Sequence, residues 1–152
     1  MKRLATIIFI VFSVYIFADE IQTTSHKINV GYSCISYNNV SVGYSYDQVT
    51  QNGFHGSGNS FGLQYQYQFE NRKSIIRPFF NRYNWDIPTL IGISVPLDIT
   101  NHKIGLAPHF GISFWGNLHL FYRYNFMITD YKSSFHELVL EINIPLVKNR
   151  KL

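Results

Sequence analysis

The chain has 152 residues, of which 46% are hydrophobic, 17% are aromatic and 14% are charged, and its formal net charge is +4. Two of the 13 basic residues, Lys2 and Arg3, belong to the N-terminal segment, so the remaining chain carries 11 basic against 9 acidic residues, a net charge of +2. A balance so close to neutral excludes a strongly basic nucleic-acid-binding protein, and the length predicts a single domain. A lone cysteine, Cys34, excludes an internal disulfide.

The first 18 residues have the three parts of a secretory signal peptide. Lys2 and Arg3 give a positive start, an apolar stretch follows from Leu4 to Phe17, and the small residue Ala18 suits cleavage. We therefore expect cleavage after Ala18. The alternative is an uncleaved anchor helix, but this apolar stretch is shorter than the roughly 20 residues that span a bilayer as a helix.

The next segments alternate apolar and polar residues with a period of two, which is the spacing of a β-strand with two unlike faces. Residues 28–34 and 40–46 follow this pattern, and Asn38 and Asn39 between them tolerate the left-handed backbone of a turn. We expect a hairpin, with one long bent strand over 28–46 as the alternative. The apolar positions are even-numbered in both segments, so the hairpin requires a three-residue loop or a bulge to keep the two faces apart.

Residues 48–59 contain three glycines and are predicted to form the longest surface loop. The following ten residues, 60–69, alternate strictly between aromatic or aliphatic residues and glycine or glutamine. A strand that faces bulk water usually carries charged residues on its polar face. The uncharged polar face of 60–69 therefore indicates an inward orientation, with the aromatic face outward, as in a transmembrane β-barrel.

Further period-two segments continue toward the C-terminus at residues 74–85, 89–97, 104–114, 118–126 and 137–144. Together with the earlier segments they give eight strands if 28–46 is a hairpin and seven if it is one strand. The strands are about as long as the roughly 9 to 11 residues that cross a bilayer at a tilt. An even count returns both termini to the periplasmic side, which places the 48–59 loop there, whereas seven strands would place that loop outside.

The run from Gly105 to Asn125 resembles uncharacterised small bacterial outer-membrane β-barrel proteins of the eight-stranded type. It contains a Pro-x-x-Gly strand at 108–111, then Asn117-Leu118, then Tyr-x-Tyr-Asn at 122–125. The resemblance implies insertion into the outer membrane of a Gram-negative-type bacterium, with outer-membrane lipid and the barrel-assembly machinery as partners. It brings no catalytic residue. Such barrels commonly end on an aromatic residue, whereas this chain continues past its last predicted strand.

The sequence thus predicts an all-β fold, an up-and-down antiparallel transmembrane β-barrel of eight strands. We expect a signal peptide at 1–18, the barrel domain at 19–146 and a basic C-terminal tail at 147–152. The expected role is structural or mediated by loops, in adhesion or envelope integrity. Two alternatives stay open: a soluble periplasmic lipocalin-like barrel that binds an apolar ligand, and an outer-membrane hydrolase that modifies lipid A.

Two sets of side chains are expected to matter for a membrane barrel. One set faces lipid: Phe61, Leu63, Tyr65, Tyr67, Leu120, Tyr122, Leu138, Leu140 and Ile142. The other is a structural ion cluster in the lumen, in which Arg123 lies near both Glu137 and Glu141 across the last two strands and His109 approaches from the preceding strand. A more specific hypothesis is that these charges form a path for protons or ions through the barrel.

Catalytic and metal sites are not expected. His55, Ser57 and Asn59 partly resemble the His-x-Ser-Asn element of lipid A deacylases, but Glu70 would lie at the far end of a strand, too far to orient His55. The six histidines show no ligand spacing, and no phosphate-cradling glycine motif, cofactor motif or nucleic-acid face is visible.

Overall fold

The computed structural model describes residues 22–52 and 55–150, so the predicted signal peptide lies outside the described residues. These residues form strands and one short 3-10 helix, η1 (Tyr131–Ser133). The strands are β1 (Gln22–Ile35), β2 (Asn39–Asn52), β3 (His55–Gln68), β4 (Lys73–Asn84), β5 (Thr89–Ser94), β6 (Leu97–Asp98), β7 (Lys103–Phe114), β8 (Leu118–Met127) and β9 (Phe135–Arg150).

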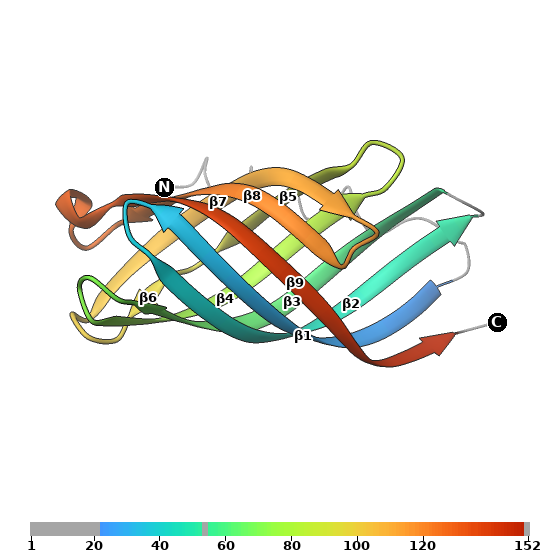
Figure 1. Ribbon diagram of the computed structural model, residues 1–152, viewed down its shortest axis with the longest axis horizontal. Coiled ribbons are helices and arrows are strands. Elements are labelled where there is room, and N and C mark those ends of the chain that lie inside the picture. The colour runs from blue at the N-terminus through green and yellow to red at the C-terminus, as the bar shows by residue number, and fades with distance from the viewer. Residues whose placement is uncertain (1–21, 53–54, 151–152) are drawn as a thin grey trace, which may run out of the picture.

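The strands close into one antiparallel barrel (Figure 1). Apart from β5 and β6, each strand pairs with the next along the chain, and β1 also pairs with β9, which joins the first strand to the last. The short strands β5 and β6 are two parts of one strand, interrupted at Val95 and Pro96, because both pair with β4 and with β7. The fold is therefore the eight-stranded up-and-down barrel that the sequence predicts.

The first hairpin keeps its two faces apart with a three-residue loop at 36–38. Tyr32 lies opposite Val40 and Val30 opposite Val42, so the even-numbered apolar residues of both strands share one face. Ile35, at the entrance to the loop, has a φ of 103°. The hairpin interpretation is confirmed, and the alternative of one long strand over 28–46 is wrong.

The predicted loop at 48–59 is wrong. Strand β2 continues to Asn52 and β3 begins at His55, and their pairing is unbroken from Gln48 opposite Asn59 to Asn52 opposite His55. The glycines that suggested a loop have a packing role: Gly56 lies under the ring of Trp85 and Gly58 under that of Tyr83. Any Cβ at these two positions would overlap the rings, so glycine in this strand marks a close approach rather than a turn.

We expect Gly58→Ala to lower the free energy of unfolding in detergent by about 1 to 3 kcal/mol, because the added methyl group must displace the buried Tyr83 ring. The matched control is Ser57→Ala on the opposite face of the same strand, which should change stability by less than about 0.5 kcal/mol. Equal unfolding midpoints for the two variants would show that Tyr83 does not pack on Gly58.

The last strand is longer than the sequence predicts. Strand β9 runs to Arg150 and pairs with β1 as far as Thr23, so residues 147–150 are part of the barrel wall and not of a separate basic tail. Residues 151–152 of the predicted tail lie outside the described residues. The register shifts between His26 and Lys27, where a bulge in β9 follows Pro145, a residue that lacks the N–H group of a regular ladder.

The barrel has two unlike ends. The loop end carries the connections at 36–38, 69–72, 99–102 and 128–134, and the terminal end carries the turns at 85–88 and 115–117 together with the start of β1 and the end of β9 (right side of Figure 1). Small apolar clusters fill the lumen toward each end. One contains Val49, Tyr83, Leu90, Phe121 and Val139, and the other contains Ile75, Met127 and Phe135.

Carboxylates tie the connections of the loop end together. Both carboxylate oxygens of Glu70 accept a hydrogen bond from the backbone N–H of Asn38 at 3.0 Å, and the Asn38 side chain donates a further bond at 2.6 Å. The backbone hydrogen bond from Asn38 lowers the pKa of Glu70 below its ordinary value of 4.5. Across the same end, Asp130 accepts a hydrogen bond from Lys103 at 2.7 Å, which lowers the pKa of Asp130.

The lowered pKa gives the Glu70 contact a defined pH dependence. A carboxyl whose pKa is lower in the folded state stabilises that state at neutral pH, and the stabilisation is lost as the pH falls below 4.5 through the folded-state value. We expect hydrogen exchange of the Asn38 amide, corrected for the intrinsic pH dependence, to lose protection over that range. In Glu70→Gln the protection should be lower at neutral pH and should not change with acid. Identical pH profiles of exchange for the parent and Glu70→Gln would show that Glu70 does not protect the Asn38 amide.

Candidate functional site

The lumen is organised around the fully buried carboxylate of Glu137 on β9. Its oxygens accept hydrogen bonds from four neutral side chains contributed by four other strands: Ser33 at 3.0 Å, Asn39 at 3.0 Å, Gln66 at 2.5 Å and Asn125 at 2.8 Å. A buried carboxylate needs several donors and a cation to offset its lost hydration. Glu137 has both, since two guanidinium groups also reach it.

The two guanidinium groups differ in how well they are held. Arg77 on β4 is fully buried and lies 3.4 Å from Glu137, and it also donates to Asn125 at 2.6 Å and to Gln66 at 2.7 Å. Arg123 on β8 lies directly opposite Glu137 in the register, but its closest approach to the carboxylate is 3.5 Å. Arg123 also packs over the Phe121 ring, 4.9 Å from its centroid. Arg77 is therefore the better-bound partner.

The predicted ion cluster is only partly assembled in this way. The structure brings Arg123 and Glu137 together, and it places His109 opposite Arg123 in the register of β7 and β8. The expectation that Arg123 also serves Glu141 is not met by any ion pair among the described residues. Glu141 instead lies opposite His119, 3.7 Å from its Nδ1.

The remaining two members of that cluster bind neutral amides. Glu141 accepts a hydrogen bond from Gln64 at 2.9 Å. His109 is hydrogen bonded through Nε2 to the side-chain oxygen of Asn81 at 2.6 Å. The four predicted residues therefore all point into the lumen but belong to several local networks. His109, Arg123 and Glu137 lie in one row of the register, whereas Glu141 lies four residues farther along β9.

A second ion pair lies nearer the terminal end and was not predicted. Lys27 on β1 and Asp47 on β2 are both buried, and their charged atoms are 2.7 Å apart. Lys27 also donates to the backbone oxygen of Gly116 at 2.7 Å, and Tyr83 donates to Asp47 at 2.8 Å. The pair thus fastens the turn at 115–117 across the mouth of the barrel.

The buried charges of the described residues are three cations, Lys27, Arg77 and Arg123, and four carboxylates, Asp47, Asp98, Glu137 and Glu141. The fourth carboxylate, Asp98 on β6, lies 3.9 Å from the half-buried Lys73. Sequence reasoning missed Lys27, Arg77, Asp47 and Asp98. The signal was present in the alternation: Lys27 and Asp47 each lie one residue beyond a predicted strand, on its polar face, and Arg77 shares a face with the buried Ile75.

The predicted lipid-facing side chains all lie on the outer surface of the barrel. Their strands alternate between this surface and the lumen, so that Leu140 is 46% exposed whereas its neighbour Val139 is 2% exposed. The other members of the set are Phe61, Leu63, Tyr65, Tyr67, Leu120, Tyr122, Leu138 and Ile142, which are exposed or half-buried on that surface.

The residues of the deacylase-like pattern do not come together. Ser57 is near the start of β3, opposite Asn84 at the terminal end, whereas Glu70 follows β3 and binds Asn38 at the loop end. A general base and its orienting carboxylate must lie within hydrogen-bond reach, so this pattern cannot operate as a catalytic triad.

The described residues contain no group of three or more His, Cys, Asp or Glu side chains placed to hold a metal ion. Within the same residues, no helix has the length and apolar character needed to cross a membrane.

Comparisons of the chain with protein-family models, with curated proteins and with solved structures found no match in any of the three.

Proposed function

We propose that the chain is a small β-barrel protein of a bacterial outer membrane, with a closed lumen and a structural role in the envelope. The observation that carries the proposal is the distribution of side chains between the two faces. Most of the buried side chains are polar or charged, with two small apolar clusters among them, while Leu, Ile, Val, Phe and Tyr cover the outside. In water this arrangement is unfavourable, because a monomeric soluble protein rarely exposes so large an apolar surface.

The height of the apolar surface fits a bilayer. On the outer face of β8 and the residue that follows it, exposed hydrophobic residues extend from Leu118 to Ile128. This is about 33 Å of strand at roughly 3.3 Å per residue, or about 25 Å of height at a tilt of about 40°. An apolar band of about 25 Å is what transmembrane barrels present to lipid.

Amphipathic rings lie on the outer face toward each end of the barrel. Toward the terminal end, His26 is hydrogen bonded to the Tyr44 hydroxyl on the outer face of β1 and β2. Toward the loop end, the Tyr122 hydroxyl is hydrogen bonded to His136 on the outer face of β8 and β9. Rings with polar atoms concentrate at the membrane–water interface, where the ring contacts acyl chains and the polar atom reaches water.

The lumen supports a structural role better than that of a pore. Eight strands enclose an interior that side chains alone can fill. Here buried side chains from several strands meet in the hydrogen-bond network around Glu137. The connections at the loop end are short, from three to seven residues, and two of them are tied by Glu70. Short tied loops favour an envelope role over adhesion through long loops.

The two alternatives from the sequence find less support. A lipocalin-like barrel needs an apolar interior for its ligand, whereas most of the side chains buried here are polar or charged. A lipid A hydrolase needs Ser57 and Glu70 in one site, and they lie at opposite ends of β3.

Cell fractionation tests the proposal. We expect the protein in the outer-membrane fraction, resistant to extraction by high salt and by alkaline carbonate, because its apolar band holds it in lipid. An inner-membrane lipoprotein and a soluble periplasmic protein serve as fractionation controls. Recovery in the soluble periplasm would overturn the proposal and favour the lipocalin-like alternative.

A further inference from the structure

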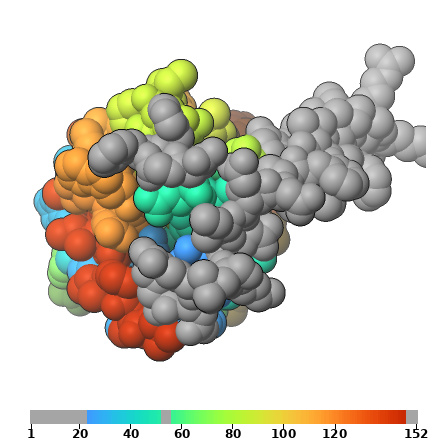
Figure 2. All heavy atoms as spheres, turned by 90° about the vertical axis from the view of Figure 1, so that its right-hand side faces the viewer, coloured from blue at the N-terminus to red at the C-terminus, as the bar shows by residue number. Residues whose placement is uncertain are grey.

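A cavity of about 100 Å³ opens in the mouth of the barrel at the terminal end. Figure 2 looks into this end, where β9, the β7–β8 turn, the β4–β5 turn and β2 surround the mouth and atoms of β1 are visible within it. The cavity is lined by Thr23, Ser25, Lys27, Val49, Gln51, Trp85, Trp115, Asn117 and Pro145. No residue of the Glu137 network belongs to it.

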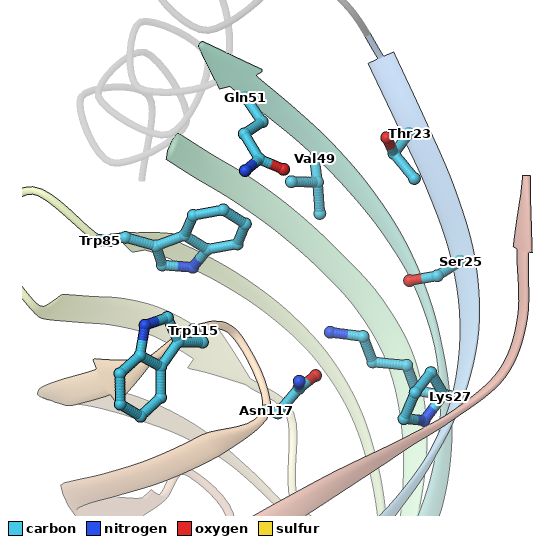
Figure 3. Close-up of a pocket in the computed structure, with 9 residues that line it drawn as sticks. Thr23, Ser25, Lys27, Val49, Gln51, Trp85, Trp115 and Asn117 are labelled. Atoms are coloured by element: carbon cyan, nitrogen blue, oxygen red, sulfur yellow. The ribbon is translucent and has the colours of Figure 1, made fainter. Parts of the chain in front are cut away.

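The walls of the cavity are of two kinds (Figure 3). Trp85 and Trp115 form one side, and the hydroxyl residues Thr23 and Ser25 face them from β1, with the amide of Asn117 pointing into the space between. Flat aromatic rings combined with a few convergent polar groups are the usual composition of a small-molecule site. The chain has only two tryptophans, and both line this cavity.

Each tryptophan presents a group that a ligand could use. The Nε1 atom of Trp85 is buried and has no hydrogen-bond partner among the described residues, although an unpaired buried donor is costly. Trp115 is 77% exposed at the tip of a tight turn in which Trp115 and Gly116 both have positive φ angles, 51° and 67°. A ligand that accepts a hydrogen bond from Trp85 and covers the Trp115 ring would pair the donor and bury the exposed ring.

The charge of the cavity selects the chemical class of that ligand. Lys27 is the one charged lining residue, and Asp47 neutralises it at 2.7 Å, so the site offers no net attraction to an anion or a cation. The ligand should therefore be neutral, should present an apolar face to a tryptophan ring, and should carry groups that both donate and accept hydrogen bonds. A sugar ring has these properties, since its C–H face is apolar and its substituents are hydroxyl or amide groups.

We propose that this mouth binds a neutral carbohydrate. The cavity is small, about 100 Å³, and open at the rim, so in this proposal it accepts one substituent of a sugar, such as a hydroxymethyl or acetamido group. The ring then lies at the rim against Trp115, and the substituent meets the Trp85 indole N–H and the Asn117 amide. This inference rests on the proposed function in one respect only, which is that the proposed function places the binding site on the periplasmic side of the membrane.

The two tryptophans provide the readout. The full mature chain is folded in a zwitterionic detergent without a sugar headgroup and titrated with chitotriose and maltotriose, and intrinsic fluorescence is recorded. We expect a saturable change with at least one sugar in the millimolar range. An N-acetylated alanine tripeptide amide tests the peptide class, and binding of that peptide without binding of either sugar would overturn the proposal.

Single variants identify the site. Trp85→Phe keeps a ring but removes the N–H donor, and Asn117→Ala removes the amide, so each should weaken sugar binding by about five- to tenfold. Each variant retains a tryptophan reporter, and resistance of the folded band to detergent in electrophoresis confirms that it is folded. Tyr131→Ala, exposed at the loop end, is the matched control and should bind as the parent does.

Two results would overturn the carbohydrate site: no saturable change with either sugar throughout the millimolar range, or unchanged half-saturation in folded Trp85→Phe and Asn117→Ala. Because the titration is done in detergent, its outcome is independent of cell fractionation. A protein that fractionates with the outer membrane but binds no sugar would retain the proposed function and lose only this inference.

Discussion

Replacing Glu137 by leucine is expected to lower the free energy of unfolding of the barrel in detergent by about 3 to 5 kcal/mol. The carboxylate is fully buried, and it is the shared partner of Arg77 and Arg123. Without it two guanidinium groups stay buried beside one less anion, and four neutral donors lose their acceptor. The measurement is the urea unfolding midpoint of parent and variant, followed by tryptophan fluorescence.

Arg123→Leu is the informative comparison. Because Arg77 remains 3.4 Å from Glu137 and Arg123 makes only a 3.5 Å contact, this variant should lose about 1 to 3 kcal/mol, less than Glu137→Leu. The double variant Arg77→Leu/Glu137→Leu should recover part of the loss of Glu137→Leu, since it removes one of the two unmatched cations. If Arg123→Leu proves as damaging as Glu137→Leu, then Arg123 and not Arg77 is the principal partner.

The second large effect is expected on the outer surface. Leu120→Arg places a charge inside the apolar band, which runs from Leu118 to Ile128 on this strand, and should lower the free energy of unfolding in a lipid bilayer by about 2 kcal/mol, the lower end of the range for a charge near the midplane. Leu120 lies opposite Leu140 on β9 and Ile112 on β7, so the two residues directly opposite the new side chain would be aliphatic. Stability is measured by urea unfolding of the barrel reconstituted in vesicles.

The control for this effect is Thr89→Arg, at the exposed start of β5 near the terminal end. There the arginine can reach water, so the cost should be below about 1 kcal/mol. Similar losses for the two variants would mean that depth in the bilayer does not determine the cost, which would contradict the assignment of this surface to lipid.

Much of the fold could be predicted because both faces of the strands carry a consistent chemistry. The strict alternation of residues 60–69, with glutamine and glycine on one face, indicated a polar interior before any pairing was known. The even-numbered apolar positions of the first two strands also indicated that a hairpin needs a three-residue loop or a bulge, and the three-residue loop at 36–38 keeps Tyr32 and Val40 on the same side.

The errors came from residues whose structural role depends on a partner that is distant in the sequence. Gly56 and Gly58 suggested a loop because the rings that lie over them come from distant residues, Tyr83 on β4 and Trp85 in the turn that follows it. That error ended the predicted second strand at residue 46 and hid Asp47, the partner of Lys27.

The candidate site was only partly predictable for the same reason. Arg123 and Glu137 lie on adjacent strands, so alternation and the turn between them were enough to bring them together. Arg77 reaches Glu137 across the lumen from β4, which does not pair with β9. No short-range pattern reports a contact through the interior of a closed barrel, and Pro78 beside Arg77 weakened the strand assignment further.

The central claim is that the outer face of the barrel contacts lipid, and spin labels measure this contact directly. In a Cys34→Ala background, single labels are placed at Leu138, Leu140 and Ile142 on the outer face of β9 and at Ile87 in a turn of the terminal end. In vesicles, the three β9 labels should be relaxed by oxygen and protected from a water-soluble nickel chelate, and Ile87 should show the reverse. A label at Leu140 as accessible to the nickel chelate as the label at Ile87 would contradict a membrane-spanning barrel.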